Sequence, residues 1–276
     1  MKQYLDALSY CYQNGKDVYS RAGKVRKVFG YQIRFNLNKG FPALTTKKLA
    51  WKSVVSELLW FLEGSNDERR LAEILYEEDR RDLKDKKTIW TQNANSEYWK
   101  DKAKFFGDVG RIYGVQWRDF KGIDQIKNLI KGIKRDPNGR RHILSAWNPA
   151  ELELMSLPPC HAFSQFFVSN RKLSCQLYQR SCDMFLGVPF NIASYSLLLH
   201  LIATECDLEV DEFILTLGDY HIYHEHFDQV EIQLKREPRK LPQLKFKPKD
   251  IFSYKVNDFE LIDYNPHPTI QAKMNV

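Results

Sequence analysis

The sequence lacks paired-cysteine motifs, long apolar runs and low-complexity tracts, and each absence excludes a class of protein. Its five cysteines form no CxxC pair and no zinc-finger spacing, and their odd number predicts free thiols in a reducing compartment. The longest apolar stretch, residues 192–203, is short and is interrupted by His200, so no membrane span is expected. The first residues show no apolar targeting core, and we therefore expect a cytoplasmic protein.

No internal repeat and no linker divides the chain, so its 276 residues are expected to form a single domain over positions 1–276. An apolar content of 43% is sufficient to build a substantial core. The net charge of +7 fits an anionic ligand such as a phosphate. Charge alone also fits a general affinity for nucleic acid.

Apolar spacing predicts the main elements. Helices are expected over residues 4–14, 50–63, 123–133 and 189–206, with a solvated helical region over 65–87. Strands are expected over residues 28–37, 142–147, 162–168, 172–180, 213–217 and 259–262, and a basic loop over 21–26.

The chain is organised around residues 157–195. This stretch opens with Leu157-Pro158-Pro159-Cys160-His161 and closes with Gln179-Arg180-Ser181-Cys182-Asp183-Met184-Phe185-Leu186-Gly187-Val188-Pro189-Phe190-Asn191-Ile192-Ala193-Ser194-Tyr195. The prolines suit a turn, and a thiolate at Cys160 would attack an electron-poor carbon. The commoner fate of a lone cysteine is an inert buried thiol. A neighbouring Arg180 would lower the thiol pKa and hold a phosphate, and Asn191 matches a carbonyl beside a ring N–H.

Glu57 falls beside Val54 and Phe61, on or near the buried face of the helix expected over residues 50–63. Burial would raise the carboxyl pKa and suit Glu57 to relay protons. The alternative is a boundary glutamate that points to solvent. A thiol, an arginine, an amide and this carboxylate together suit addition to carbon six of a uracil ring, which makes carbon five nucleophilic.

Three other groups invite a functional interpretation. Arg21 lies in a basic loop that either faces a phosphate or is merely solvated, and Arg140-Arg141 either clamp a phosphate or flank a strand. The histidines at 221, 224 and 226 are spaced i, i+3 and i+5 and do not share one helix face, so no metal site is expected. His221 and Tyr223 are better interpreted as ligands of a hydroxyl group.

These residues resemble the thymidylate synthase family over nearly the whole chain. The resemblance rests on the two motifs above and on Phe41-Pro42-Ala43-Leu44-Thr45-Thr46-Lys47-Lys48, Glu57-Leu58-Leu59-Trp60-Phe61-Leu62 and Gly218-Asp219 with His221-Ile222-Tyr223. It implies an α+β fold with a large bent mixed β-sheet flanked by helices, whose sheet faces form the interface of a homodimer with shared active sites. It implies dUMP as the acceptor and 5,10-methylenetetrahydrofolate as the cosubstrate, without a metal, a membrane or a required nucleic acid.

The resemblance also implies roles for individual residues. The catalytic set is Cys160 as nucleophile with Glu57, Tyr113, His161, Asn191 and Asp183. The dUMP-binding set is Arg21, Arg140, Arg141, Gln179, Arg180, Ser181, Asp183, Asn191, His221 and Tyr223, of which Arg140 and Arg141 come from the other subunit. The folate-binding set is Lys48, Trp90, Asp183, Leu186, Gly187, Phe190 and Val276. An asparagine at position 191 argues for uracil, because an aspartate there accompanies cytosine in related hydroxymethylases.

The chain departs from the family pattern around the folate. It has Ser20-Arg21-Ala22-Gly23-Lys24-Val25-Arg26 where the family usually reads Asp-Arg-Thr-Gly-Thr-Gly-Thr, and Thr91-Gln92-Asn93 after Trp90 where it reads Asp-Glu-Trp. It has Arg111 in place of a proline, and Glu225-His226 in place of an Asn-His pair. Thr91, Gln92 and Asn93 could position a water that captures the exocyclic methylene intermediate.

That possibility predicts a deoxyuridylate hydroxymethylase, of the kind certain phages use to make modified DNA, acting in the host cytoplasm if phage-encoded. Thymidylate synthase, which makes dTMP and dihydrofolate, is the alternative. Two other classes explain less. A Cys-His hydrolase would need Cys160 and His161 to face each other although they are adjacent in sequence, and an RNA-binding role would rest on charge and scattered aromatics.

Overall fold

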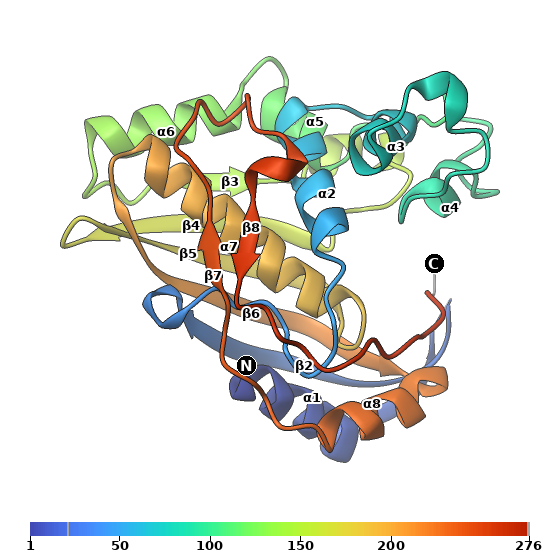
Figure 1. Ribbon diagram of the computed structural model, residues 1–276. Helices are drawn as coiled ribbons and strands as arrows, with labels where there is room; N and C mark the ends of the chain where they lie inside the picture. The colour runs from blue at the N-terminus through green and yellow to red at the C-terminus, as the bar shows by residue number, and fades with distance from the viewer. Residues whose placement is uncertain (21, 275–276) are drawn as a thin grey trace.

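The computed structural model describes residues 1–20 and 22–274, and its centre is a six-stranded mixed sheet (Figure 1). The strand order is β1 (Lys16–Ser20), β2 (Gly23–Asn36), β6 (Glu209–Tyr223), β5 (Lys172–Asp183), β4 (His161–Ser169) and β3 (Ile143–Ser145). Strands β5 and β6 run parallel and every other neighbouring pair is antiparallel. The expected mixed sheet flanked by helices, and the α+β class, are confirmed.

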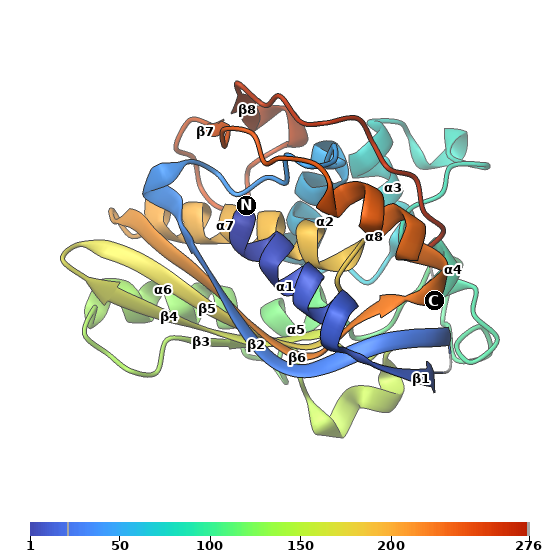
Figure 2. The same ribbon diagram turned by 90° about the horizontal axis from the view of Figure 1, so that it is seen from below.

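Helix α7 (Gly187–Glu205) makes the crossover between the parallel strands β5 and β6. Together with α1 (Lys2–Asn14) and α8 (Phe227–Leu234), it lies on one side of the sheet (Figure 2). By length and composition α7 could cross a membrane, but 78% of its apolar window is buried inside the protein. A helix that is apolar on all sides and enclosed in this way is a core helix. Its N-terminal turn carries Asn191, so the core positions that side chain.

A second group of helices completes the fold. It contains α2 (Trp51–Glu63), α3 (Glu68–Tyr76), α4 (Thr91–Ala94), α5 (Tyr113–Arg118) and α6 (Gln125–Arg135). Helix α2 lies near the start of α7, and α6 lies near its end. Helix α2 packs against α3, α5 and α7 and ends at Gly64, whose φ of +74° is a left-handed conformation that favours glycine. A small antiparallel pair, β7 (Gln243–Lys245) and β8 (Glu260–Ile262), lies outside the main sheet.

Some expected elements differ from the observed ones. The stretch 21–26, expected as a basic loop, instead contains the start of β2, which pairs with β1 from Gly23 onward. The hairpin of β1 and β2 lies at the sheet edge, where a strand needs no apolar face. Its residues therefore lack the alternating apolar pattern that would have predicted a strand. The charged region 65–87 holds only α3 and a 3₁₀ turn, Arg80–Asp82. The strand expected over 213–217 is much longer, because polar residues continue it beyond its apolar centre to Tyr223.

The sheet face opposite α7 carries exposed aromatic side chains. Burial alternates along β4, so that Phe166 is buried while Phe163 and Phe167 are 42% and 62% exposed. On β2, Phe29 is 81% exposed. Large apolar side chains gathered on one face in this way are typical of an interaction surface.

Candidate active site

A cavity of about 700 Å³ lies where the C-terminal parts of β5 and β6, the start of α7 and helix α2 converge. It brings together fifteen of the residues expected from the sequence. They are Glu57, Trp90, Tyr113, Cys160, His161, Gln179, Arg180, Ser181, Asp183, Leu186, Gly187, Phe190, Asn191, His221 and Tyr223. Positions up to 166 apart in the chain therefore meet at one surface.

Cys160 stands just before β4 and opposite the guanidinium of Arg180. The Arg180 Nη2 atom lies 4.0 Å from the Cys160 Sγ atom, and the Arg180 backbone N–H donates to the Cys160 carbonyl at 2.6 Å. The carbonyls of Pro158 and Pro159 each accept a hydrogen bond from the guanidinium at 3.1 Å. The two prolines thus orient the arginine as well as the turn. Burial raises the pKa of the Cys160 thiol, and the positive charge of Arg180 opposes that shift.

Glu57 is only 6% exposed, so the alternative in which it points to solvent is wrong. The indole N–H of Trp90 donates to Glu57 Oε1 at 2.7 Å. Burial raises the pKa of this carboxyl to about 7, and the indole hydrogen bond opposes the increase. A carboxyl with a pKa near neutrality can both hold and release a proton under physiological conditions.

Tyr113, His161 and Tyr195 form a buried aromatic group beside the thiol. The Tyr113 hydroxyl accepts the backbone N–H of Cys160 at 2.7 Å, and its ring stacks on the His161 ring with centroids 3.8 Å apart. The Tyr195 hydroxyl lies 2.8 Å from His161 Nδ1. Burial lowers the pKa of His161 to about 3, so this imidazole is neutral near pH 7.

The carboxamide of Asn191 is fixed by its neighbour on β5. Gln179 Nε2 donates to Asn191 Oδ1 at 3.0 Å, which leaves the Asn191 N–H₂ group and one Oδ1 lone pair for a ligand. Asp183 Oδ1 accepts the backbone N–H groups of Phe185 and Leu186 at 3.0 and 3.3 Å. This carboxylate therefore shapes the entry into α7.

His221 near the end of β6, and His224 and His226 in the 3₁₀ turn that follows, have different partners. His221 Nδ1 lies 3.3 Å from the Asp219 carboxylate and lines the cavity, whereas His224 Nε2 lies 3.1 Å from Asp17. His226 contacts the Lys273 carbonyl at 2.7 Å. Over residues 1–20 and 22–274, no group of three His, Cys, Asp or Glu side chains could hold a metal ion.

Of the other five expected site residues, two lie near a sheet edge, one lines an adjoining cavity and two fall outside the described residues. Arg140 and Arg141 are exposed, near the edge strand β3, and the structure does not bring them to Cys160 within one chain. Lys48 lines the adjoining cavity of about 390 Å³, which shares Glu57, Leu186 and Phe190 with the first. Arg21 and Val276 lie outside the described residues.

The segment after Trp90 is oriented differently from our expectation. Asn93 is buried and lines the cavity, but Gln92 is exposed and does not. The Thr91 hydroxyl donates to Glu68 at 2.5 Å. Of the three residues expected to position a water, only Asn93 lines the cavity.

A protein-family model described as thymidylate synthase matches residues 2–276 of the chain. The chain belongs to the thymidylate synthase family. The protein is accordingly a folate-dependent one-carbon transferase that acts on dUMP. The match extends over both the sheet and the second group of helices, and so includes every element that lines the cavity at Cys160.

Sequence reasoning missed several residues of this thymidylate synthase family site. Tyr195 lies four positions after Asn191 in the same helix, and that spacing was the available signal that both face the cavity side. Trp147 lines the cavity with the Arg180 guanidinium 5.5 Å from its ring centroid. Lys47 is buried beside the adjoining cavity, donates to the Phe185 carbonyl, and has its pKa lowered to about 7 by burial.

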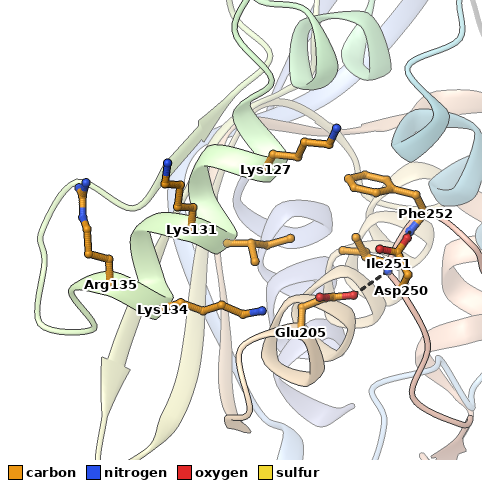
Figure 3. Close-up of a pocket in the computed structure, with 9 residues that line it drawn as sticks. Lys127, Lys131, Lys134, Arg135, Glu205, Asp250, Ile251 and Phe252 are labelled. Carbon is orange, nitrogen blue, oxygen red and sulfur yellow. Dashed lines mark hydrogen bonds between the residues drawn. The ribbon is translucent and has the colours of Figure 1, made fainter.

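Part of the positive charge of this thymidylate synthase family member lies elsewhere. A cavity of about 760 Å³ separates α6 from the end of α7 and is lined by none of the residues around Cys160 (Figure 3). Its cationic side chains are Lys127, Lys131, Lys134 and Arg135. Lys134 extends toward Glu205, which accepts the backbone N–H of Ile251 at 2.7 Å (Figure 3). Net charge alone therefore does not locate an anion-binding site in this protein.

Proposed function

We propose that the protein transfers a one-carbon unit to carbon five of dUMP through a covalent adduct between Cys160 and the nucleotide. The Cys160 thiolate bonds to carbon six of the uracil ring. The electron pair of the C5–C6 double bond then shifts to carbon five, in conjugation with the carbonyl at carbon four. The observation that carries this proposal is the 4.0 Å approach of Arg180 to the Cys160 sulfur, in a cavity that also holds Glu57 and Asn191.

Binding of dUMP uses charge at one end and hydrogen bonds at the other. We assign Arg180 and Ser181 to the phosphate, together with Arg21, and we assign His221 and Tyr223 to the sugar hydroxyl. The Asn191 N–H₂ group faces carbonyl O4 and its Oδ1 atom faces N3–H, an orientation supported by the hydrogen bond from Gln179. A bidentate amide of this kind selects uracil because cytosine presents the reverse donor and acceptor pattern.

Proton transfer is assigned to the buried carboxyl and its neighbours. Glu57, with a pKa near 7, exchanges protons with the carbonyl at carbon four, directly or through water. Neutral His161 and the Tyr113 hydroxyl complete the polar network beside the thiol. The C5 proton leaves to this network before the product forms, and the thiolate departs when the C5–C6 double bond is restored.

The cavity residues fit a folate cosubstrate. Trp90, Leu186 and Phe190 offer aromatic and aliphatic surface for a ring system beside the carboxylate of Asp183 and the backbone at Gly187. In the adjoining cavity, Lys48 suits the carboxylates of a glutamate tail. Val276, outside the described residues, is also assigned to the folate. When bound, 5,10-methylenetetrahydrofolate supplies the one-carbon unit and, in the methylating reaction, a hydride.

For the product, we favour reductive methylation to dTMP. Water capture needs a polar group near the exocyclic methylene, and two of the three candidates, Thr91 and Gln92, are directed elsewhere. Next to Trp90 the lining includes Ile89, Leu186 and Phe190, apolar surface that suits hydride transfer better than capture of a water. The second candidate, a deoxyuridylate hydroxymethylase, is supported by Asn93, which is buried and lines the cavity where the family usually has a tryptophan.

Product analysis distinguishes the two reactions. The protein is incubated with dUMP and 5,10-methylenetetrahydrofolate, and the nucleotide is identified by mass while dihydrofolate is measured by absorbance. We expect dTMP and dihydrofolate in equal amounts. A nucleotide heavier than dTMP by one oxygen, without dihydrofolate, would replace this proposal with the hydroxymethylase. Cys160→Ala serves as the control in which neither product forms.

We further propose a homodimer built on the exposed sheet face. The exposed rings of Phe163 and Phe167 on β4 support this surface as the contact. Arg140 and Arg141 are assigned to the phosphate in the site of the other subunit, in keeping with their not lining the cavity of their own chain. The single domain over residues 1–276 and the cytoplasmic location also remain proposals, and free thiols at all five cysteines support a reducing compartment.

A further inference from the structure

A buried ion pair lies behind the wall of the cavity, at the start of α3. Glu68 is 1% exposed and Arg69 is 5% exposed. Arg69 donates to both carboxylate oxygens of Glu68, at 2.6 Å from Nε and 2.5 Å from Nη2. Neither residue lines the cavity at Cys160. An enclosed pair of this kind adds little net stability, because loss of hydration offsets the attraction between the charges.

The pair is connected to the loop that leads to Trp90. Arg69 Nη1 donates to the carbonyls of Leu83 and Lys86 at 3.2 and 2.9 Å. Glu68 Oε1 accepts the hydroxyl of Thr88 at 2.7 Å and the hydroxyl of Thr91 at 2.5 Å. The same ion pair therefore holds both the backbone at Leu83 and Lys86 and the side chains of Thr88 and Thr91.

The hydroxyls of Thr88 and Thr91, which are held by Glu68, also accept hydrogen bonds from the backbone around Trp90. Thr88 Oγ1 accepts the Trp90 backbone N–H at 3.1 Å, and Thr91 Oγ1 accepts the Thr88 backbone N–H at 2.8 Å. Each hydroxyl thus receives an N–H group and donates its own proton to Glu68. The indole of Trp90 then extends to Glu57 at 2.7 Å. An unbroken series of hydrogen bonds runs from Arg69 to the carboxyl in the cavity.

We propose that Glu68 is a positioning residue for one-carbon transfer, which fixes Thr88 and Thr91 so that the Trp90 indole stays hydrogen-bonded to Glu57. The role of Glu68 in the reaction rests on the function proposed above. The hydrogen-bonded connection from Glu68 to Glu57 is independent of that function. The ionised carboxylate is required because all its partners are donors: Arg69, Thr88 and Thr91. Although burial raises the pKa of Glu68, the hydrogen bonds from Arg69, Thr91 and Thr88 outweigh it and bring the pKa below its usual range.

The most direct test observes the indole itself. In protein labelled with ¹⁵N at tryptophan, a Trp90→Phe variant assigns the Trp90 indole N–H resonance among the six tryptophans. In the wild-type protein we expect this resonance to shift with pH near 7, following ionisation of Glu57. Glu68→Gln places an N–H₂ group against donors, so the loop is displaced. We expect the Trp90 resonance to move and to lose its pH-dependent shift.

Glu73→Gln is the matched control, because it makes the same chemical change on the same helix, at a residue paired with Arg70 at the surface. We expect the Trp90 resonance to be unchanged in this variant. If Glu68→Gln fails to fold, Thr88→Val removes the same link and Thr88→Ser restores the hydroxyl. A wild-type Trp90 resonance in folded Glu68→Gln or in Thr88→Val would overturn the proposal.

Kinetics separate positioning from a purely structural role. In folded Glu68→Gln we expect kcat to fall between about tenfold and a hundredfold, because a displaced catalytic carboxyl loses its alignment. We expect the KM for dUMP to change less than about twofold, since the nucleotide-binding residues are untouched. An unchanged kcat with a displaced resonance would also contradict the proposal. If the wild-type protein makes no product, the function proposed above fails, while the resonance still tests the link to Glu57.

Discussion

The indole N–H of Trp90 donates a hydrogen bond of 2.7 Å to the buried carboxyl of Glu57. This contact joins a residue proposed to bind the folate to a residue proposed to transfer protons, and both line the cavity. The indole nitrogen is the only polar atom of the Trp90 side chain, and it contacts a carboxyl whose pKa is raised to about 7. The hydrogen bond lets Glu57 ionise despite its burial, since an unpaired carboxylate there would be strongly disfavoured.

The raised pKa of Glu57 makes a prediction about stability. The unfolded carboxyl has a pKa of 4.5 and the folded one about 7, so between these values the folded state binds more protons. The contribution to stability is fully present below pH 4.5 and is lost as pH rises through 7. The difference is roughly 3 kcal/mol at high pH. Glu57→Gln should therefore gain stability relative to the wild type as pH rises from about 5 to about 8.

Urea unfolding of both proteins across this pH range measures that difference. If the two proteins differ in their free energy of unfolding by the same amount at all pH values, Glu57 does not titrate with a raised pKa.

The same variant should lose activity, because the carboxamide introduced by Glu57→Gln cannot exchange protons. We expect kcat to fall by about a hundredfold, within the range usual for general acid–base catalysis.

Asn191→Asp tests the assignment of the pyrimidine reader. The hydrogen bond from Gln179 now reaches a carboxyl group, whose oxygens can accept from the amino group of cytosine. We expect kcat/KM for dUMP to fall by about a hundredfold or more, and turnover of dCMP to become measurable, because an unpaired polar group in the pocket is costly. Isotopically labelled dUMP and dCMP offered together give the ratio directly. An unchanged preference for dUMP would remove Asn191 from the substrate-binding set.

The proposed dimer is tested by Phe167→Glu. This ring is 62% exposed on the open sheet face, and a carboxylate there should prevent a second chain from packing. We expect light scattering to give twice the 32.6 kDa chain mass for the wild type and a single chain for the variant. Ile232→Glu, on the helix-covered side, is the control and should remain dimeric (Figure 2). A wild-type protein that is monomeric at micromolar concentration would contradict the dimer.

Shared active sites make a separate prediction. Cys160→Ala and Arg141→Ala subunits are each expected to form dimers of low activity. Unfolding and refolding the two together should give mixed dimers, each with one complete site. Activity should then recover to roughly a quarter of the wild-type value. No recovery would mean that Arg141 does not act in the site of its partner.

The sequence was a good guide where one side of an element is apolar. The spacing of Val54, Leu58 and Phe61 predicted α2 and put Glu57 on or near its buried side, and the structure shows the side chain buried. It was a poor guide at the sheet edge, where residues 23–27 form part of β2 without an apolar pattern. Hydrogen bonds along the edge, which the side chains do not reveal, hold that segment.

The candidate site was predictable where motifs are local and unpredictable where the partner is distant. Cys160, Arg180 and Asn191 lie within one stretch, and the cavity holds all three. The direction of Thr91 depends on Glu68, 23 positions earlier and buried with Arg69, and no pattern near Trp90 indicated that contact. The contact of Thr91 with Glu68 is therefore the observation behind our preference for dTMP as the proposed product.

The account rests on nucleophilic attack by Cys160 on the pyrimidine, and release of the C5 hydrogen measures that step whichever product forms. dUMP carrying tritium at carbon five is incubated with 5,10-methylenetetrahydrofolate and either the wild-type protein or Cys160→Ala. We predict that the wild type transfers tritium to water in step with nucleotide turnover, and that Cys160→Ala releases none above background. Equal release by both proteins, or product formation by the wild type with tritium retained at carbon five, would contradict the central claim.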